Sequence, residues 1–182
     1  MLTVVKVGGG VGDDALPDLC AALGELGRRH SLLVVPGGAR FADAVRDADR
    51  RFGLSDAAAH RMAILGMEQF GWLLSDLIPG AERITDLERA AAGRTSVLLP
   101  AGLAFDELPA SWDVTADSIA AWVARKAGAG RLVLVKAGPG VDEYFPTALE
   151  GARFETCVIA PARLAELLDG GPVDPLLRLP HG

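Results

Sequence analysis

The sequence predicts an α/β fold built around a parallel sheet, and three observations predict it. Half of the 182 residues are apolar, mostly Ala, Leu and Val, while only 5 % are aromatic. Short β-branched runs alternate with longer segments of helical periodicity. Two of these runs end in glycine loops. Strands that alternate with helices favour a parallel sheet covered by small-residue helices, and the length suits a single domain spanning residues 1–182.

The first part of the chain contains a strand, glycine loop and helix unit twice. Each strand is a continuous apolar run, and each loop contains adjacent glycines that end the run. The basic residues that close the first helix complement its dipole. The expected elements are strands at Leu2–Val7 and Ser31–Val35, glycine loops at 8–10 and 36–38, and helices at Leu16–Arg29 and about Phe41–Phe52.

The rest of the chain continues the alternation. Ser55 can cap a long helix over Asp56–Leu77, and Thr85–Glu88 has capping-box spacing for a short helix. The further expected elements are strands at Thr95–Leu99, Arg131–Lys136 and Cys157–Ile159, an Ala-rich helix from about Asp117 to Lys126, and a helix at about Pro161–Leu168. The Pro-rich tail, 172–182, carries no motif.

The composition argues against several classes of partner. A net charge of −6 and a pI near 5.0 disfavour nucleic acid, which requires clustered Lys and Arg. No apolar run approaches the roughly 20 residues that span a bilayer, and the first is too short for a signal peptide. We therefore expect a cytoplasmic protein without a membrane partner.

The cysteines and histidines do not predict a metal site. Cys20 and Cys157 form no C-x-x-C pair, and His30, His60 and His181 are scattered. Two reduced, buried thiols are the simplest interpretation. Any metal is expected to arrive with a nucleotide.

Two strand-end lysines indicate the chemistry. Ligands of parallel sheets collect at the carboxyl ends of the strands, where Lys6, Lys136 and the glycine loops should converge. Phosphoryl transfer needs positive charge and backbone N–H groups around the phosphates. A glycine pair alone more often makes a turn, and Asp117 alone would be a helix-start carboxylate. The combination favours phosphoryl transfer, although neither loop fits a Walker or dinucleotide-binding fingerprint.

Four motifs resemble the amino-acid kinase superfamily. They are Val5-Lys6-Val7-Gly8-Gly9, Pro36-Gly37-Gly38, Asp117-Ser118 and Leu134-Val135-Lys136. The runs Pro36–Arg46, Ala59–Leu65 and Trp112–Ser118 are similar to a small branch, the aminomethylfuranmethyl phosphate kinases of methanofuran biosynthesis. The resemblance covers roughly residues 2 to 145.

The resemblance implies a three-layer αβα sandwich of the carbamate-kinase type, with a mainly parallel sheet and a reduced C-terminal part. It implies an ATP-dependent kinase of one-carbon cofactor synthesis, with Mg²⁺ held mainly by the nucleotide phosphates and a homo-oligomeric assembly. Residues 1–110 would form the acceptor half and 111–182 the nucleotide half. Lys6 and Lys136 would neutralise the transferred group and Asp117 would orient them, whereas the phosphate-binding positions would be Gly8, Gly9, Gly10, Gly37, Gly38 and Ser118.

The acceptor pocket is inferred from the second glycine loop and the helices after it. Arg40, Arg46 and His60 are candidate contacts to an anionic substrate, Arg40 first among them. Each has a plainer interpretation, because Arg46 suits a solvated helix face and His60 a partly buried structural histidine.

The chain departs from the family pattern in two loops. Gly10 occupies the position of the usual Ser or Thr, and Glu143 that of a glycine. These departures leave open a non-catalytic subunit that binds a nucleotide or an oxyanion, as in molybdenum-storage relatives, or a structural partner in a larger assembly.

Overall fold

A computed structural model describes residues 1–90, 93–171, 175 and 177–178. Its centre is one seven-stranded sheet with the order β3-β4-β2-β1-β5-β6-β7. The first six strands pair in parallel and β7 is antiparallel to β6, which confirms the prediction of a mainly parallel sheet. The strands are β1 (Leu2–Val7), β2 (Ser31–Pro36), β3 (Glu82–Ile84), β4 (Thr95–Leu98), β5 (Arg131–Val135), β6 (Glu155–Ile159) and β7 (Leu177–Arg178).

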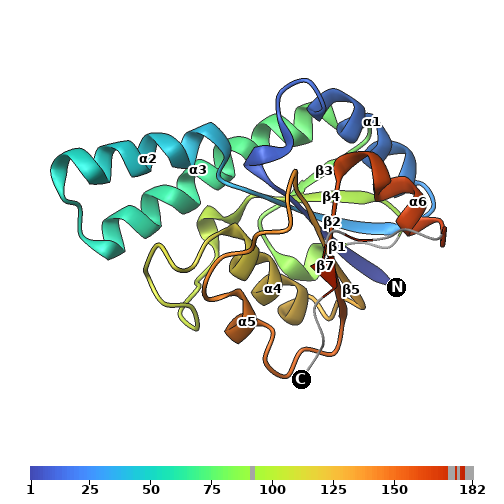
Figure 1. Ribbon diagram of the computed structural model, residues 1–182. Coiled ribbons are helices and arrows are strands. Elements are labelled where there is room, and N and C mark those ends of the chain that lie inside the picture. Colours follow the sequence, from blue (N-terminus) through green and yellow to red (C-terminus); the bar gives the residue numbers. More distant parts are fainter. Residues whose placement is uncertain (91–92, 172–174, 176, 179–182) are drawn as a thin grey trace.

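Helices cover both faces of the sheet and complete the predicted three-layer αβα sandwich (Figure 1). One face is covered by α1, α6 and the second half of α3, and the other by α4 and α5. The helix α2 and the first half of α3 form a hairpin that projects beyond the sheet (Figure 1). The helices are α1 (Leu16–Gly27), α2 (Ala39–Phe52), α3 (Asp56–Leu77), α4 (Ala116–Lys126), α5 (Phe145–Ala148) and α6 (Leu164–Leu168).

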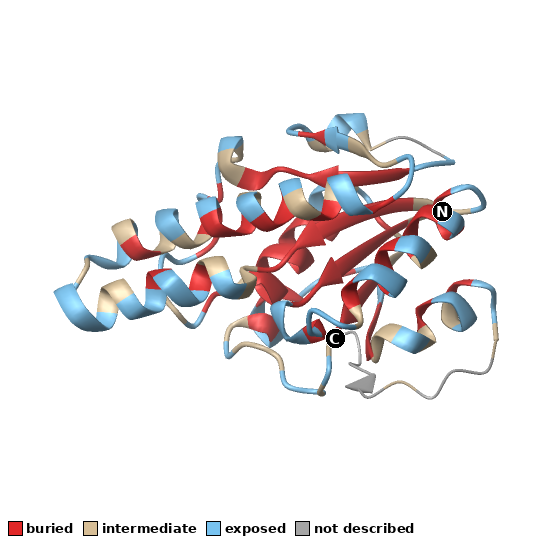
Figure 2. Cartoon of the chain, turned by 90° about the horizontal axis from the view of Figure 1, so that it is seen from above, coloured by how far each residue is buried: buried red, intermediate tan, exposed pale blue. Residues whose placement is uncertain are grey.

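The alternation of side chains along β1 divides the core into two layers. Val5 and Val7 pack with α1 and α6, whereas Val4 packs with α4 and α5. Successive residues of a strand point to opposite faces, so Lys6 shares the α4 side with Val4. The central strands β1, β2 and β5 are buried except at their first residues (Figure 2), and the polar head of Lys6 therefore needs a partner on that side.

The sheet joins strands from the two predicted halves of the chain. Strands β1 to β4 come from the first 110 residues, and the remaining three come from 111–182. Because β1 pairs with β5 across the boundary between these halves, one continuous sheet carries both halves.

Several local expectations were wrong. β3 was not predicted, since its three residues become a strand only through pairing with β4. The expected helix at Thr85–Glu88 is a 3₁₀ turn over Leu87–Arg89, with Asp86 as its cap. The expected helix from Pro161 begins with a 3₁₀ turn, Pro161–Arg163, and the other 3₁₀ turns are Gly9–Val11 and Pro100–Gly102. His181 and all but three positions of the tail lie outside the described residues.

Among the described residues, no helix combines the length and the apolar character needed to cross a bilayer.

Candidate functional site

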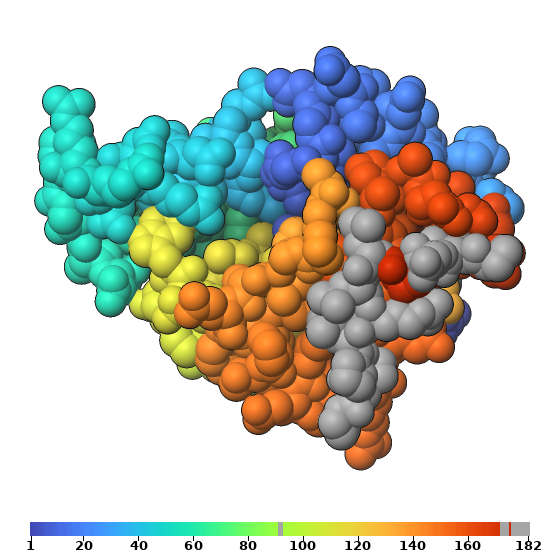
Figure 3. All heavy atoms as spheres, in the orientation of Figure 1, coloured from blue at the N-terminus to red at the C-terminus, as the bar shows by residue number. Residues whose placement is uncertain are grey.

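A cavity of about 530 Å³ lies at the carboxyl ends of the three central strands. The glycine loops follow β1 and β2, and Lys136 follows β5, so neighbouring strands deliver all three to the same edge. The projecting α2–α3 hairpin forms one wall, and the segment 111–119 with the start of α4 forms the other. Figure 3 shows the molecule hollowed between these parts, which are coloured teal and yellow.

Two lysines share one buried carboxylate at the base of this cavity. Lys6 Nζ lies 2.8 Å from Asp117 Oδ1, and Lys136 Nζ lies 2.6 Å from Asp117 Oδ2. Lys6 and Asp117 are only 5 % and 2 % exposed. Asp117 stands in the first turn of α4, where the helix dipole favours a negative charge. Asp117 thus contacts both of the other predicted catalytic residues, Lys6 and Lys136, and Lys136 also donates to the Gly140 carbonyl oxygen.

Burial and neighbouring charges shift the pKa values of Asp117 and Lys6. Burial raises the pKa of Asp117, but Lys6 and Lys136 outweigh it and hold the pKa below the usual range. Burial lowers the pKa of Lys6 more than Asp117 raises it, and Lys136 lowers it further. The trio therefore carries an ionised carboxylate between two lysines, and when both lysines are protonated its net charge is +1. A phosphate group would supply the missing counter-charge.

Asp142 fixes the start of α4 and was not predicted. One of its carboxylate oxygens accepts hydrogen bonds from Thr115 N at 2.9 Å, Thr115 Oγ1 at 2.8 Å and Ser118 N at 3.1 Å. The other accepts from Ser118 Oγ. These bonds replace a local N-cap, because Thr115 makes no capping bond of its own. Asp142 lies 24 residues beyond Ser118, and no local pattern announces such a cap.

Ser118 faces this cap and not the cavity. It is fully buried, and its hydroxyl donates a hydrogen bond to Asp142. The structure thus places this predicted phosphate-binding residue behind the cavity wall.

Some backbone N–H groups of the glycine loops are used in the sheet, and others are free to bind a ligand. Gly8 N–H donates to Val135 O at 3.0 Å, and Gly37 N–H donates to Val7 O at 2.8 Å, so both extend the strand pairing. A Cβ at Gly9 would lie 2.5 Å from Ala39 Cα, which explains the glycine there. Gly9 and Gly10 open a 3₁₀ turn whose first amides have no partner within the turn. In the described part of the chain, Gly38 N–H has no hydrogen-bond acceptor.

The start of α2 forms a concave group of backbone donors. Gly38 is right-handed, with φ −79° and ψ −27°, while Ala39 has a positive φ of 46°. Successive right- and left-handed residues turn consecutive N–H groups toward a common point, which is an anion-binding arrangement. Because these are also the first amides of a helix, Gly38, Ala39 and Arg40 present unpaired donors with a favourable dipole.

The predicted acceptor residues separate into two places. Arg46 and His60 line the main cavity, and burial lowers the pKa of His60. Arg40 instead lines an adjacent hollow of about 370 Å³ beside the first glycine loop, where it pairs with Asp13 at 2.7 Å.

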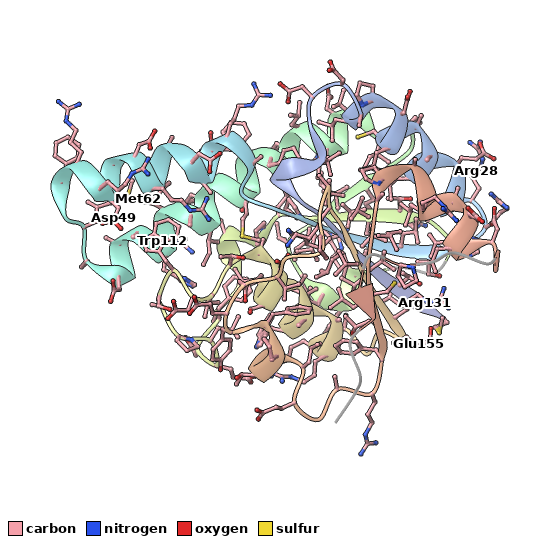
Figure 4. The ribbon with its side chains drawn as sticks, in the orientation of Figure 1. Arg28, Asp49, Met62, Trp112, Arg131 and Glu155 are labelled. Carbon is pink, nitrogen blue, oxygen red and sulfur yellow. The ribbon has the colours of Figure 1, made fainter. Side chains whose placement is uncertain are left out.

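Trp112 and Asp43 line the main cavity and were not predicted as site residues. The Arg46 guanidinium lies 5.0 Å from the ring centroid of Trp112, and it pairs with Asp43 at 2.9 Å. Trp112 Nε1 donates to Asp49 Oδ2 at 2.7 Å, and Figure 4 shows these two side chains meeting below α2. The Trp-Asp-Val-Thr run marks this segment in the sequence, but only the fold brings it to α2.

No group of three His, Cys, Asp or Glu side chains suited to a metal occurs in the described ranges. The free amides and lysines fit nucleotide phosphates, which would bring Mg²⁺ with them.

Comparisons with known proteins found one similar sequence and several similar folds. The chain is 27 % identical over 150 residues to the [5-(aminomethyl)furan-3-yl]methyl phosphate kinase of Methanocaldococcus jannaschii, covering 79 % of this chain and 69 % of that protein. Uridylate kinase from Archaeoglobus fulgidus superposes with a TM-score of 0.75 at 17 % identity, covering 94 % of this chain and 97 % of that one. UMP kinase from Ureaplasma parvum gives 0.67 at 11 %, over 94 % and 96 %.

These two structural neighbours share the fold with the chain. A family model, described as the amino acid kinase family, matches residues 1–154, which include Lys6, Asp117 and Lys136. The chain belongs to the amino acid kinase family.

Proposed function

We propose that the protein is a kinase that transfers the γ-phosphoryl group of ATP to a small phosphorylated acceptor. The observation that carries this proposal is the contact of Lys6, Asp117 and Lys136 at the base of a cavity rimmed by free backbone amides. Phosphoryl transfer needs little beyond alignment and charge stabilisation, and this site offers both.

Each residue of the trio has a distinct role in the proposed reaction. Lys6 and Lys136 stabilise the negative charge that develops on the transferred group, and Asp117 holds the two ammonium groups at a fixed separation. The amides of Gly9, Gly10 and Gly38 bind phosphate oxygens. No covalent nucleophile on the protein is required. ATP brings Mg²⁺ on its phosphates, and 111–182 serves as the nucleotide half.

The acceptor that we propose is [5-(aminomethyl)furan-3-yl]methyl phosphate, which is named for the Methanocaldococcus relative. The reaction forms a phosphoanhydride bond on the acceptor's phosphate as the bond between the β- and γ-phosphates of ATP breaks, which leaves ADP. The protein would thereby act in the synthesis of a furan-containing one-carbon cofactor. As for other kinases of the fold, we expect a homo-oligomer.

The test is a single-turnover reaction with ATP, Mg²⁺ and this monophosphate. We expect ADP and the diphosphate in equal amounts, and a loss of about 10³-fold in rate for Lys6→Ala, since the lysine acts mainly on the transition state. The variant Arg28→Ala, at the exposed end of α1, is the control and should keep the wild-type rate. ATP consumption without a diphosphate product would overturn the proposed acceptor, and the absence of both ADP and the diphosphate would overturn the proposed kinase activity.

One observation favours a second candidate function. Lys136 is also bonded to the Gly140 carbonyl, inside the loop that departs from the family pattern. A lysine held there could bind a nucleotide without promoting transfer. In that case ATP would bind to the wild-type protein, and neither Lys6→Ala nor Asp117→Ala would have any activity to lose.

A further inference from the structure

We infer that the cavity selects an acceptor that carries a cationic group on a flat apolar ring, and that Asp43 is the residue that recognises the cation. This inference rests on the proposed function, because it takes the acceptor's phosphate to lie at the lysines and the amides. It adds the determinant of acceptor specificity at the opposite end of the cavity.

The two ends of the cavity differ in charge. At the base, Lys6 and Lys136 flank the single carboxylate of Asp117, and the free amides add further positive character. At the far end, the Asp43 carboxylate pairs with the Arg46 guanidinium, and Asp49, which accepts from Trp112 Nε1, does not line the cavity. The far end therefore lacks the excess positive charge of the base. A ligand with an anion at one end and a cation at the other complements this arrangement.

The middle of the cavity is apolar. The walls between the charged ends come from α3, the start of α4 and the first turns of α2, and one aromatic ring closes them near the far end. Their side chains are those of Ala42, Ile64, Met67, Trp112, Val114 and Ile119. Such walls suit a flat ring, with the indole of Trp112 as a stacking surface.

The lining gives little support to a nucleobase as the acceptor's ring. A pyrimidine base presents adjacent donors and acceptors, which a side-chain carboxamide would satisfy as a pair. The chain has no asparagine, and its one glutamine, Gln69, is not among the cavity residues. A ring without paired polar edges leaves fewer groups unsatisfied here.

The position of Asp43 suits a contact with the cationic group of the acceptor. It lies one helical turn after Ala39 on the same cavity wall, which is about 6 Å along α2 from the amides that open the helix. Only its Oδ1 is used by Arg46, so Oδ2 remains available as an acceptor. The Asp43 side chain is 71 % exposed without ligand, which screens the attraction and limits the expected discrimination.

The test compares two ligands by calorimetry, [5-(aminomethyl)furan-3-yl]methyl phosphate and an analogue with a methyl group in place of the aminomethyl group. We expect the wild-type protein to bind the amine about tenfold more tightly, as a screened charge-assisted hydrogen bond allows. Asp43→Asn keeps the shape of the side chain and removes its charge. This variant should bind the amine only as tightly as it binds the analogue, and its affinity for the analogue should equal that of the wild type.

The matched control is Asp47→Asn. Asp47 is the next acidic residue of α2, it pairs with Arg50 as Asp43 pairs with Arg46, and it does not line the cavity. This variant should discriminate like the wild type. Equal affinity of the wild type for both ligands, or an equal loss for both in Asp43→Asn, would overturn the inference even if the kinase reaction proceeds. A second outcome is that only Asp43→Asn loses the discrimination between the two ligands while the wild type forms no diphosphate. This outcome would support the inference and count against the kinase activity.

Discussion

Asp117 is the residue on which the charge balance of the site depends. Its carboxylate lies within 2.8 Å of both lysines and is almost completely buried, as is Lys6. Removing one partner of a buried ion pair leaves an uncompensated charge, whereas replacing the pair by apolar groups of similar size costs much less. Stability and catalysis can therefore be separated at this position.

We predict that Asp117→Ala lowers the free energy of unfolding by about 3 kcal/mol and abolishes phosphoryl transfer. The double variant Lys6→Met/Asp117→Leu should recover most of the stability and none of the activity. Urea unfolding followed by circular dichroism measures the first effect, and an ADP assay measures the second. A single variant as stable as the wild type would contradict the buried pair.

The same pair has a predictable dependence on pH. The pKa of Asp117 is depressed in the folded protein, so its contribution to stability is fully present above the unfolded pKa of 3.8 and is lost as the pH falls through the lower folded value. The stability of the wild type should therefore be compared with that of Lys6→Met/Asp117→Leu, which has no titrating group at either position, and the Asp117 contribution to the difference should be constant from pH 7 to pH 5. Urea titrations at several pH values would show this contribution shrinking only below pH 3.8, and an earlier decline would contradict this assignment.

Ala39 is the one described residue other than glycine with a positive φ. A left-handed alanine costs about 1–2 kcal/mol, and part of this is regained by Ala39→Gly after the larger chain entropy of glycine is subtracted. We predict that Ala39→Gly stabilises the protein by about 0.5 kcal/mol. The control is Ala44→Gly, in the exposed interior of α2, which should destabilise by about 1 kcal/mol. Thermal unfolding distinguishes them, and equal losses would contradict the strained conformation.

At the scale of elements, the site depends on where α4 begins. The segment after β5 reaches back to this helix and caps it through Asp142, so the position of Asp117 depends on a loop that follows it in the chain. Asp142 touches neither lysine by hydrogen bond, and we assign it a positioning role.

We predict that Asp142→Ala lowers the free energy of unfolding by about 2 kcal/mol, because four hydrogen bonds to Thr115 and Ser118 are lost. It should lower kcat while the KM for the acceptor stays the same, since Asp117 shifts and the acceptor walls do not. Asp142→Asn should restore part of kcat. The exposed neighbour variant Glu143→Ala serves as control, and an unchanged kcat in Asp142→Ala would contradict the positioning role.

At the scale of the whole molecule, α3 presents an apolar stripe to solvent. Met62, Leu65 and Trp72 recur at helical spacing on its outer face and are 38 %, 43 % and 50 % exposed, with Arg83 stacked on Trp72. A stripe of this kind on a long helix suits a symmetric contact with a second copy.

We predict that the protein self-associates through this stripe and that Leu65→Glu weakens the association, because it buries a charge in the contact. Sedimentation velocity should show a shift toward the monomer. Phe52→Ser, at the tip of the hairpin and away from the stripe, should leave the assembly unchanged although Phe52 is more exposed. A Leu65→Glu protein that associates like the wild type would contradict the stripe as the contact.

The sequence was sufficient to predict the central strands and the lysines and glycine loops at their carboxyl ends. Continuous apolar runs, glycine pairs and strand-end lysines are local signals, and parallel pairing brings them to one edge without further information. For the same reason Lys6 and Lys136 were predicted to converge, whereas the role of Asp117 beside them was implied by the family resemblance. β3 was missed because it has only three residues and gains its identity from β4.

What only the tertiary structure decided was the use made of each polar group. It assigned the Gly8 and Gly37 amides to the sheet, Ser118 to a buried cap, and Arg40 to a neighbouring hollow. It also brought Asp43, Trp112 and Asp142 to the site from three separate segments, in which none of them was predicted as a site residue. Local pattern determines which groups a segment offers, whereas hydrogen-bond partners are separated by tens of residues and are chosen only when the chain is packed.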